Sequence, residues 1–319
     1  MFTLIVLAYN EEKYIEKTIK ESFKHFDEVI IVNDSSKDET LNKINKLELQ
    51  DFNNLKIINN EKNIGAGKSF LNAIKEVDLN KTDYLIKIDG DNQFKIDDIL
   101  KLKKVAKDNK IDFLKCDRFW EDGIEGNIPI IRFIGNAFAS FLLKLSTSNW
   151  KLNDPLNGLF LISSKALRNF DLPKLFYRYG YPFFLSVYFS NLSIEDNLKI
   201  GQVKNTVTYR DEKSNLKAFT MLFKLLYFTL KTLVTKIKIK IKYSKLQMSG
   251  ILDFLGLGSF VTFCYSLTRF IQIRYFDYYA SQATWFLVTL IFFSISIGLI
   301  YVSQKIEYEL KLSNFYNED

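Results

Sequence analysis

The chain has 319 residues, of which 47% are hydrophobic and 25% charged, and its formal net charge is +7. This composition disfavours an intrinsically disordered protein, and its two cysteines, Cys116 and Cys264, lie too far apart to suggest a disulfide framework or a cysteine metal site. Nucleic-acid binding is not expected, because several lysines fall within residues 217–245, directly before an apolar region, where anionic lipid is the better partner.

Short apolar runs alternate with helical patterns through the first half of the chain. The runs that predict buried strands are FTLIVLA, EVIIVN, LKIINN, DYLIKI and DFLKC. FTLIVLA has no basic segment before it, so it is predicted to be a strand and not a signal peptide. The segments between the runs carry apolar residues at helical spacing: EEKYIEKTIKESF, DETLNKINKL, SFLNAIKEV and IDDILKLKKVAKD. This alternation indicates an α/β fold with a mostly parallel sheet and helices on both faces, and ligands then bind at the carboxyl ends of the strands.

Residues 118–214 are less regular. FWEDGIEGN predicts a loop, IIRFIGNAFASFLLKL a helix, and NDPLNGLFLISSKAL a turn, a strand and a helix in that order. We therefore expect one α/β domain over residues 1–214.

A basic amphipathic segment follows at residues 215–247. Its apolar residues recur at helical spacing, at Phe219, Leu222, Leu226, Leu230 and Leu233, and lysines recur every seven residues. This pattern is typical of a helix lying in a membrane interface. A soluble amphipathic helix is the alternative, and the alternating KIKIKIK fits a strand equally well.

Residues 248–305 are expected to form two transmembrane helices. ILDFLGLGSFVTFCYSLTRFIQI is long enough to span but contains Asp253 and Arg269, whereas TWFLVTLIFFSISIGLIYV contains no charge. The segment between them is nearly neutral and the flanking segments are basic, so the positive-inside rule places the α/β domain, both ends of the hairpin and a tail at residues 306–319 in the cytoplasm.

Residues 63–70, NIGAGKSF, contain a GAGKS like the end of a phosphate-binding P-loop. A P-loop requires a glycine five residues before its Gly-Lys-Ser, and counting back from Gly67 reaches Lys62. The segment also follows the third predicted strand. An NTPase is therefore not expected.

The fourth predicted strand ends in IDGDNQF. Asp89 and Asp91 are two residues apart, Gly90 lets the backbone turn closely, and Gln93 adds a neutral oxygen. Two such carboxylates can share a hard cation, so the pattern predicts an Mg²⁺ or Mn²⁺ site that substrate phosphates complete. The alternative is an acidic turn or a helix cap.

The segments VLAYNEEKYIEKTI, IIVNDSSKDET and IDGDNQF, in this order, resemble family 2 glycosyltransferases of the GT-A fold. The chain is most similar to the polyprenyl-phosphate sugar transferase branch, which includes dolichol-phosphate mannose synthase. The resemblance covers residues 1–214 and, more loosely, the two-helix tail. It implies metal-dependent, inverting transfer of a hexose from a UDP- or GDP-linked sugar to polyprenyl (undecaprenyl) phosphate at a membrane, with a bacterial inner membrane as the expected location.

The resemblance also implies roles for single residues on the nucleotide side. Asn33 stands where the family has the first acid of an Asp-Asp pair, which leaves base selectivity open, and Asp34 matches the second acid. Ordinary capping is the alternative for this turn. NIGAGKSF becomes a wall of the nucleotide pocket. The expected nucleotide-binding residues are Ala8, Tyr9, Glu11, Asn33, Asp34, Gly65, Lys68, Asp89 and Gly90.

On the acceptor side, Arg118, Arg132 and Arg210 match basic positions of the family and would pair with phosphate oxygens. Asp154, in NDPLNGLF, matches an acceptor-side aspartate and is the candidate base or orienting carboxylate. Leu159 and Phe160 replace the family's usual basic or aromatic residue after this turn, which leaves the acceptor contacts open.

In the expected reaction an oxygen of the lipid phosphate attacks the anomeric carbon as the nucleoside diphosphate leaves. Because the acceptor is already an anion, no strong protein base is needed. One alternative is a membrane glycosyltransferase that extends a glycan or glycolipid hydroxyl, which would need a general base. Another is a non-catalytic, membrane-tethered protein that binds nucleotide sugar. A homo-oligomer formed through the hairpin is also possible on this pattern.

Overall fold

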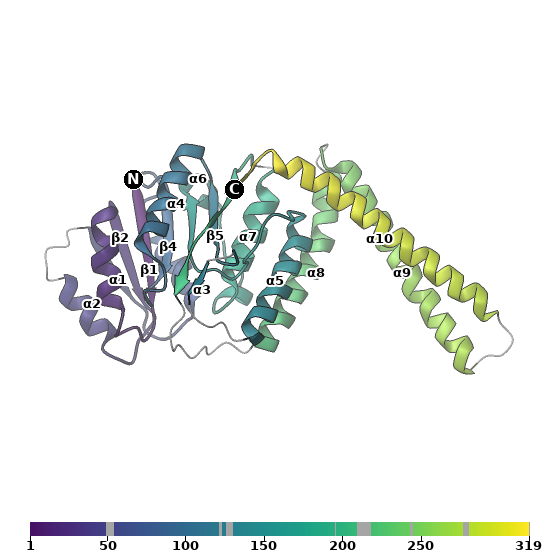
Figure 1. The fold of residues 1–319 in the computed structure, drawn as a ribbon, viewed down its shortest axis with the longest axis horizontal. Coiled ribbons are helices and arrows are strands. Elements are labelled where there is room, and N and C mark those ends of the chain that lie inside the picture. The colour runs from purple at the N-terminus through teal and green to yellow at the C-terminus, as the bar shows by residue number, and fades with distance from the viewer. Residues whose placement is uncertain are drawn as a thin grey trace. The chain divides into compact units, whose positions relative to one another are not determined.

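The computed structural model describes residues 1–48, 54–120, 123–125, 130–194, 196–208, 218–242, 245–276 and 281–318 (Figure 1). The chain forms two compact units, one made of residues 1–227 and 314–319 and the other of residues 228–313. The predicted boundary at residue 214 lies outside the described residues. The division falls later, inside a helix, so the first turns of the basic helix belong to the unit that contains the sheet.

An eight-stranded sheet forms the centre of the first unit in the described part of the chain, in the order β10-β8-β5-β7-β4-β1-β2-β3. The strands are β1 (Phe2–Ala8), β2 (Glu28–Asn33), β3 (Leu55–Asn59), β4 (Tyr84–Asp89), β5 (Phe113–Asp117), β7 (Phe160–Ser163), β8 (Ile200–Lys204) and β10 (Phe315–Asn317). Strand β7 is antiparallel to β4 and β5, whereas the other neighbouring pairs are parallel. A separate pair joins β6 (Ile124–Glu125) to β9 (Val207–Thr208). The five predicted strands correspond to β1–β5, and the predicted α/β fold class is confirmed.

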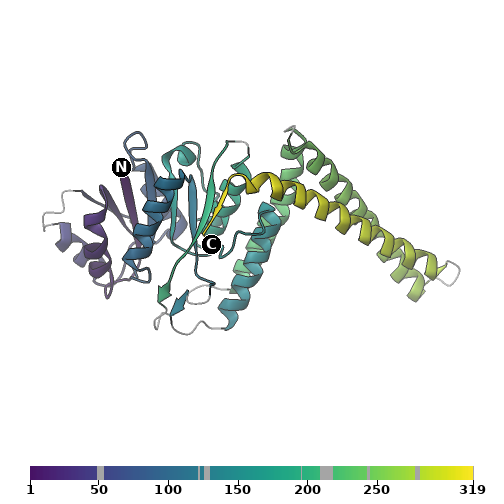
Figure 2. The ribbon, with the colours of Figure 1, turned by 45° about the horizontal axis from the view of Figure 1, so that its top comes forward.

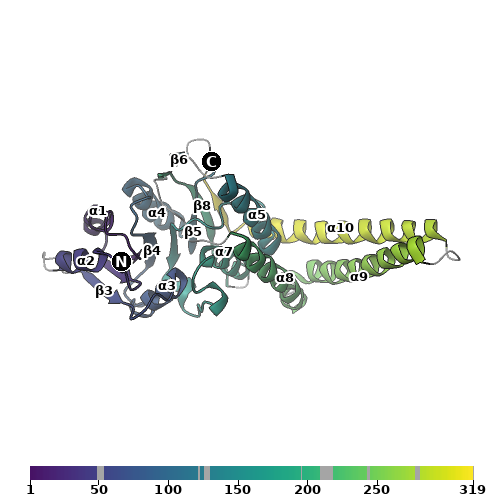
Figure 3. The ribbon, with the colours of Figure 1, turned by 90° about the horizontal axis from the view of Figure 1, so that it is seen from below.

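Helices cover both faces of the sheet, as Figure 3 shows. One face packs against α1 (Ile15–Ser22), α2 (Thr40–Glu48) and α4 (Ile96–Asn109), whose buried residues, such as Ile19, join those of the strands in one core. The other face meets α3 (Ala66–Lys75) and α7 (Tyr181–Leu192). The ring centroids of Phe70 and Phe160 lie 5.4 Å apart in an edge-to-face arrangement, and those of Phe113 and Phe189 lie 4.9 Å apart. Successive side chains of a strand point to opposite faces, so strands buried on both faces are apolar throughout.

The second unit contains the later part of α8 (Ala218–Lys242) together with α9 (Gln247–Phe276) and α10 (Gln282–Leu312). Both α9 and α10 are long and apolar enough to cross a membrane, and only 17% of each apolar stretch is buried. A core helix of a soluble protein would instead be mostly buried. The two predicted helices of the hairpin are therefore present as α9 and α10, and their apolar surface is largely exposed.

Charged side chains are buried where these three helices meet. Glu307 pairs with Lys236 at 2.8 Å, Lys240 at 2.6 Å and Lys311 at 2.7 Å, and Lys240 also pairs with Asp253 at 2.6 Å. These pairs explain the aspartate inside the first predicted span. They also explain why KIKIKIK continues a helix and forms no strand: Lys236 and Lys240 lie four residues apart and so face the same carboxylate.

Residues 306–319, the predicted tail, contain the end of a helix and a short strand. Helix α10 continues to Leu312, and residues 315–317 form β10, the edge strand beside β8. Figure 2 shows this short strand, in yellow, lying along the sheet. The sheet therefore contains residues from both sides of the hairpin in sequence. A three-residue strand carries too little pattern to be recognised from the sequence alone.

Candidate active site

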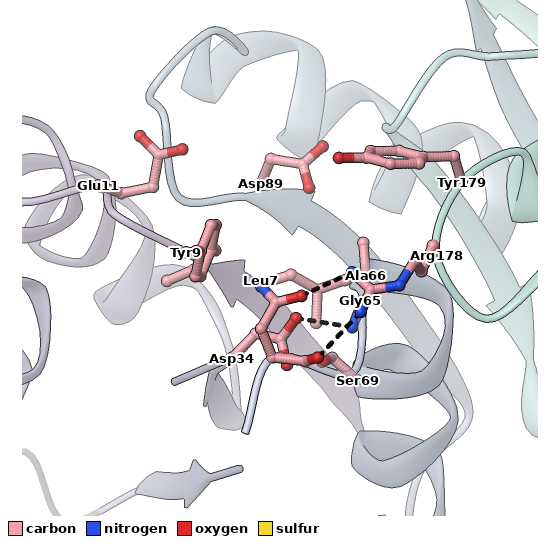
Figure 4. A pocket seen from close by; sticks show the side chains of 12 residues that line it. Leu7, Tyr9, Glu11, Asp34, Gly65, Ala66, Ser69, Asp89, Arg178 and Tyr179 are labelled. Atoms are coloured by element: carbon pink, nitrogen blue, oxygen red, sulfur yellow. Dashed lines mark hydrogen bonds between the residues drawn. The ribbon is translucent and has the colours of Figure 1, made fainter. Parts of the chain in front are cut away.

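A cavity of about 330 Å³ opens at the carboxyl ends of β1, β2 and β4 (Figure 4). Parallel strands bring these ends together at one edge of the sheet, where α/β proteins bind ligands. The lining residues are Leu7, Ala8, Tyr9, Glu11, Asp34, Asn63, Gly65, Ala66, Ser69, Asp89, Arg178 and Tyr179. Six predicted nucleotide-binding residues are thus brought together, whereas Asn33, Lys68 and Gly90 do not line the cavity.

Asp34 shapes the wall that follows β2. One carboxylate oxygen, Oδ1, accepts hydrogen bonds from the Asn60 side chain and from the Ile64 amide, both at 2.9 Å. The other, Oδ2, accepts one from the Gly65 amide at 2.8 Å. The buried carboxylate therefore fixes the turn that starts α3 while it lines the cavity.

Asn33 has a structural role in this arrangement. Its Oδ1 accepts a hydrogen bond from the Ser36 amide at 3.2 Å, and its Nδ2 donates to Asn59 at 3.3 Å. The side chain is buried, so the position that departs from the family's acid ties β2 to β3 and caps a turn.

The glycines of NIGAGKSF allow a distant loop to approach. A Cβ on Gly65, whose φ is +94°, would lie 2.6 Å from Cα of Arg178, and a Cβ on Gly67 would lie 2.1 Å from the carbonyl oxygen of Phe176. The Lys68 amide donates to the Tyr177 carbonyl at 2.8 Å, and the Lys68 ammonium lies 4.8 Å from the centre of the Tyr177 ring. This segment thus binds residues 176–178 of its own chain and is no phosphate loop.

Arg178 and Tyr179 reach the cavity through this contact, and no motif or periodic pattern in the sequence predicts their role. Nη1 of Arg178 donates to Oδ1 of Asn63 at 2.9 Å, and its Nη2 donates to the Asn63 carbonyl at 3.3 Å. The Tyr179 ring extends toward Asp89 in Figure 4. The cavity therefore holds an exposed guanidinium, which can pair with phosphate oxygens, together with the carboxylates of Glu11, Asp34 and Asp89.

Asp89 ends β4 and is paired from behind by a buried lysine. Nζ of Lys87 lies 2.7 Å from Oδ1 of Asp89 and 5.5 Å from the centre of the Tyr181 ring. Burial disfavours the ammonium form of Lys87, but Asp89 and Tyr181 outweigh this effect and raise the Lys87 pKa above its ordinary value. Gly158 leaves room for the pair, since a Cβ there would lie 2.4 Å from Oδ2 of Asp89. The signal in the sequence was a lysine inside the apolar run YLIKID.

Asp91 lies in the turn after β4, outside the cavity lining. Its Oδ1 accepts a hydrogen bond from the Gln93 amide at 3.1 Å, and Asn92 between them has a φ of +54°. Both carboxylates of IDGDNQF are therefore held close to the strand end, one inside the cavity and one in the adjoining turn.

Two of the predicted acceptor-side residues, Arg118 and Asp154, form a second cluster beyond β5. Asp154 is fully buried, and its carboxylate accepts hydrogen bonds from Nη2 of Arg118 at 3.1 Å and from Nδ2 of Asn157 at 3.0 Å. This arrangement favours an orienting carboxylate over a base. Arg132 lies on α5 (Ile130–Thr147), where its side chain is outside the described set, and Arg210 is outside the described residues.

Lys115, inside the apolar run FLKC, fastens the same turn. Its Nζ donates to the carbonyl of Asn153 at 2.6 Å and to the carbonyl of Asp154. Burial lowers the pKa of the Lys115 ammonium to about 8, although the nearby carboxylates of Asp154 and Asp117 oppose part of this shift.

We expect Lys115 to make stability depend on pH. The folded-state pKa of about 8 lies below the reference value of 10.5, so between these values the unfolded chain binds more protons and stability rises with pH. The advantage of the wild type over Lys115→Met should therefore grow from pH 8 to pH 10, by at most about 1.4 kcal/mol per pH unit. Thermal unfolding of both variants across this range measures it. A difference that shrinks with rising pH would contradict the lowered pKa.

The family model for glycosyl transferase family 2 matches residues 3–172, more than half of the chain. The chain belongs to this family. The matched residues of this glycosyltransferase include the cavity residues from Leu7 to Asp89 and the cluster of Arg118 and Asp154. Arg178 and Tyr179 lie beyond the match. The enzyme class expected from the sequence is thereby confirmed.

Three relatives extend the comparison. An uncharacterized protein of Methanocaldococcus jannaschii is 38% identical over 143 residues, which are 44% of this chain and 60% of that protein, so the match spans less than two thirds of its length. A UDP-N-acetylglucosamine–dolichyl-phosphate N-acetylglucosaminyltransferase of Methanococcus voltae is 30% identical over 52% of this chain and 70% of its own. A dolichyl-phosphate β-glucosyltransferase of Trichomonas vaginalis is 28% identical over 43% of this chain and 44% of its own.

Solved structures show a more distant likeness. A fragment of S. aureus TarS in complex with UDP-GlcNAc has a TM-score of 0.48 and 15% identity, covering 97% of this chain and 89% of that one. The mannosyltransferase PcManGT from Pyrobaculum calidifontis, in complex with GDP-Man and Mn²⁺, has a TM-score of 0.44 and 13% identity, covering 97% and 86%.

The oxygens of IDGDNQF fit a hard divalent cation by their chemistry. Magnesium is usually held by one or two carboxylates together with substrate phosphates and water, and Asp89 and Asp91 supply that number. No group of three or more His, Cys, Asp or Glu side chains that could hold a metal occurs among the residues described.

Replacing Gly67 by alanine tests the contact between the glycine segment and residues 176–178. Because the new Cβ would collide with a backbone oxygen, we expect a lower melting temperature and at least about a tenfold rise in KM for the donor. Gly135→Ala is the matched control, since that helical glycine has nothing within 4 Å of its Cβ position. Equal donor KM in the two variants would show that the contact does not shape the cavity.

Proposed function

We propose that this glycosyltransferase transfers a hexose, with inversion, from a UDP- or GDP-linked sugar to a polyprenyl phosphate at a membrane. The observation that carries the lipid acceptor is the exposed apolar surface of α9 and α10, which follow a family 2 catalytic unit in the same chain. Two of the relatives are named for dolichyl phosphate, a lipid of the same chemical class.

The catalytic unit has an apolar face of its own on α5. Five large side chains on this helix are 40% to 68% exposed and recur at helical spacing: Ile130, Phe133, Ile134, Phe138 and Phe141. Their opposite neighbours, such as Leu142 and Leu143, are buried. Soluble monomers rarely expose such a contiguous face, so it supports contact of the catalytic unit with lipid.

The first turns of α8 expose further apolar residues, Phe223 and Tyr227, with Leu230 and Val234 next along the helix. Their spacing puts them on one side, which supports the proposed interfacial helix. The position of β10, which follows the hairpin in sequence and belongs to the catalytic sheet, supports a hairpin with both ends on the catalytic side of the membrane. The basic flanks support a cytoplasmic side.

The proposed reaction divides between the two clusters. Arg178, Tyr9 and the Asp34 turn hold the donor in the cavity, and Asp89 with Asp91 would hold an Mg²⁺ or Mn²⁺ ion that neutralises charge on the departing diphosphate. Arg118, held by Asp154, offers a guanidinium to the lipid phosphate. The acceptor oxygen is already anionic, so positioning and charge neutralisation account for catalysis.

The experiment is sugar transfer by membranes that contain the full chain. Membranes are incubated with polyprenyl phosphate and a panel of radiolabelled UDP- and GDP-linked sugars, and the lipid is extracted. We expect label in the lipid from one donor, dependent on a divalent cation. Tight donor binding with no transfer from any sugar would instead favour a binding protein, and label confined to glycans would favour a transferase that acts on hydroxyls.

A further inference from the structure

Residues 315–318 are bound to the catalytic sheet. In the parallel pairing of β10 with β8, Asn317 lies opposite Gln202. Beyond the strand, Glu318 accepts a hydrogen bond from the Lys204 amide at 2.7 Å through Oε2 and pairs with Lys101 at 2.6 Å through Oε1. The Glu318 amide donates to the Gln202 carbonyl at 3.2 Å. The strand is therefore fixed by side chains as well as by the backbone.

Gln202 carries this contact to the acceptor side. The side chain is buried, and its Oε1 accepts a hydrogen bond from the Asn153 amide at 2.7 Å. Its Nε2 donates to Oδ2 of Asp117 at 3.3 Å. The main chain of Gln202 thus meets the C-terminal strand while its side chain holds the turn that contains Asp154.

That turn needs support from outside, because it is strained. Asp154 has a φ of +44°, in the left-handed region that costs a non-glycine residue free energy. Gln202 holds the turn by the amide of Asn153, and Lys115 holds it by the carbonyls of Asn153 and Asp154. This backbone conformation places the Asp154 carboxylate where it accepts hydrogen bonds from the Arg118 amide and side chain, and so orients Arg118.

We propose that β10, which follows the membrane hairpin, is a positioning element for the acceptor side of the active site and acts through Gln202. The proposal rests on the proposed function for the role of Arg118. β10 is expected to affect the acceptor and not the donor. The donor cavity lies at the ends of β1, β2 and β4, and β7 stands between these strands and β5, β8 and β10 in the sheet. Loss of the β10 contact should weaken the use of the lipid phosphate and spare the donor.

The test uses the full chain in lipid nanodiscs with three variants. Gln202→Leu removes the side-chain clamp and keeps β10, Glu318→Ala loosens β10 and keeps the clamp, and a truncation after Ser313 removes the strand. Gln247→Leu, the same change at an exposed position of α9, is the control. The readouts are hydrogen exchange of peptides covering residues 150–158 and of peptides covering β1 and β2, together with the KM values for donor and polyprenyl phosphate.

We expect faster exchange at residues 150–158 by at least about tenfold in Gln202→Leu, less in Glu318→Ala, with β1 and β2 unchanged. The KM for polyprenyl phosphate should rise at least fivefold while the donor KM stays within twofold. Unchanged exchange and lipid KM in both point variants would overturn the proposal, as would a donor KM that rises equally. If the wild type transfers no sugar to polyprenyl phosphate, the proposed function fails, whereas the exchange data still decide whether β10 holds this turn.

Discussion

Replacing Asp89 by asparagine is expected to lower kcat/KM for sugar transfer by about 10²–10³-fold, and Asp91→Asn by a comparable factor. Asp89 is the carboxylate of IDGDNQF that faces the donor cavity, and the asparagine side chain cannot neutralise a cation or keep the charge balance there. Asp97→Asn, on the exposed first turn of α4, is the control and should keep normal activity.

The Asp89→Asn variant also changes stability, because Asp89 pairs with the buried Lys87. Asparagine at position 89 leaves the buried ammonium of Lys87 without its carboxylate, so part of the effect is a loss of stability. The double variant Lys87→Met/Asp89→Asn removes that unpaired charge. We expect it to regain the melting temperature of the wild type and to remain inactive. Recovery of activity along with stability would mean that Asp89 serves the fold and not the chemistry.

Replacing Asp154 by alanine is expected to destabilise the protein by about 3–5 kcal/mol, the cost of removing one partner from a buried ion pair. Asp154 is fully buried, and the Arg118 side chain that it pairs with is 14% exposed. The substitution also removes one of the two acceptors of the Asn157 side-chain amide, which keeps its hydrogen bond to Asn205.

Thermal unfolding of Asp154→Ala measures this effect, with Asp108→Ala at an exposed position as the control. The double variant Asp154→Ala/Arg118→Met, which removes both charges, should recover most of the stability. It should still use polyprenyl phosphate poorly, because no guanidinium remains. A single Asp154→Ala variant with wild-type stability would show that the pair contributes nothing to the fold.

The sheet and one half of the site were predictable because their signals are local. Each of β1–β5 is a short, largely apolar run, and the polar residues at their carboxyl ends converge by the geometry of a parallel sheet. Asp34 was predicted from the resemblance to family 2 glycosyltransferases, whereas Asp89 follows directly from this reasoning. Arg178 does not, because it reaches the cavity through contacts with Asn63 and Gly65, more than a hundred residues earlier, and such contacts leave no periodic pattern.

The buried lysines show a different limit. Lys87 and Lys115 each interrupt an apolar strand two residues before an aspartate, and this recurring Lys-x-Asp was a visible signal. Whether such a lysine forms a buried contact depends on the burial of its side chain, which the periodicity of the sequence does not predict. Likewise the basic α8 segment predicted a surface helix, but Lys236 and Lys240 face inward because Glu307, some seventy residues later, neutralises them. Pairing of distant charges decides the orientation of these helices.

The most direct measurement of the central claim compares two acceptors of equal chain length. The purified full chain in nanodiscs is given its preferred nucleotide sugar with either polyprenyl phosphate or the corresponding polyprenol, and the glycosylated lipid is quantified. We predict transfer to the phosphate and less than about one hundredth of that rate to the alcohol, since the alcohol lacks both the anionic nucleophile and the group that Arg118 binds. Equal transfer to both, or transfer to the alcohol alone, would contradict the account.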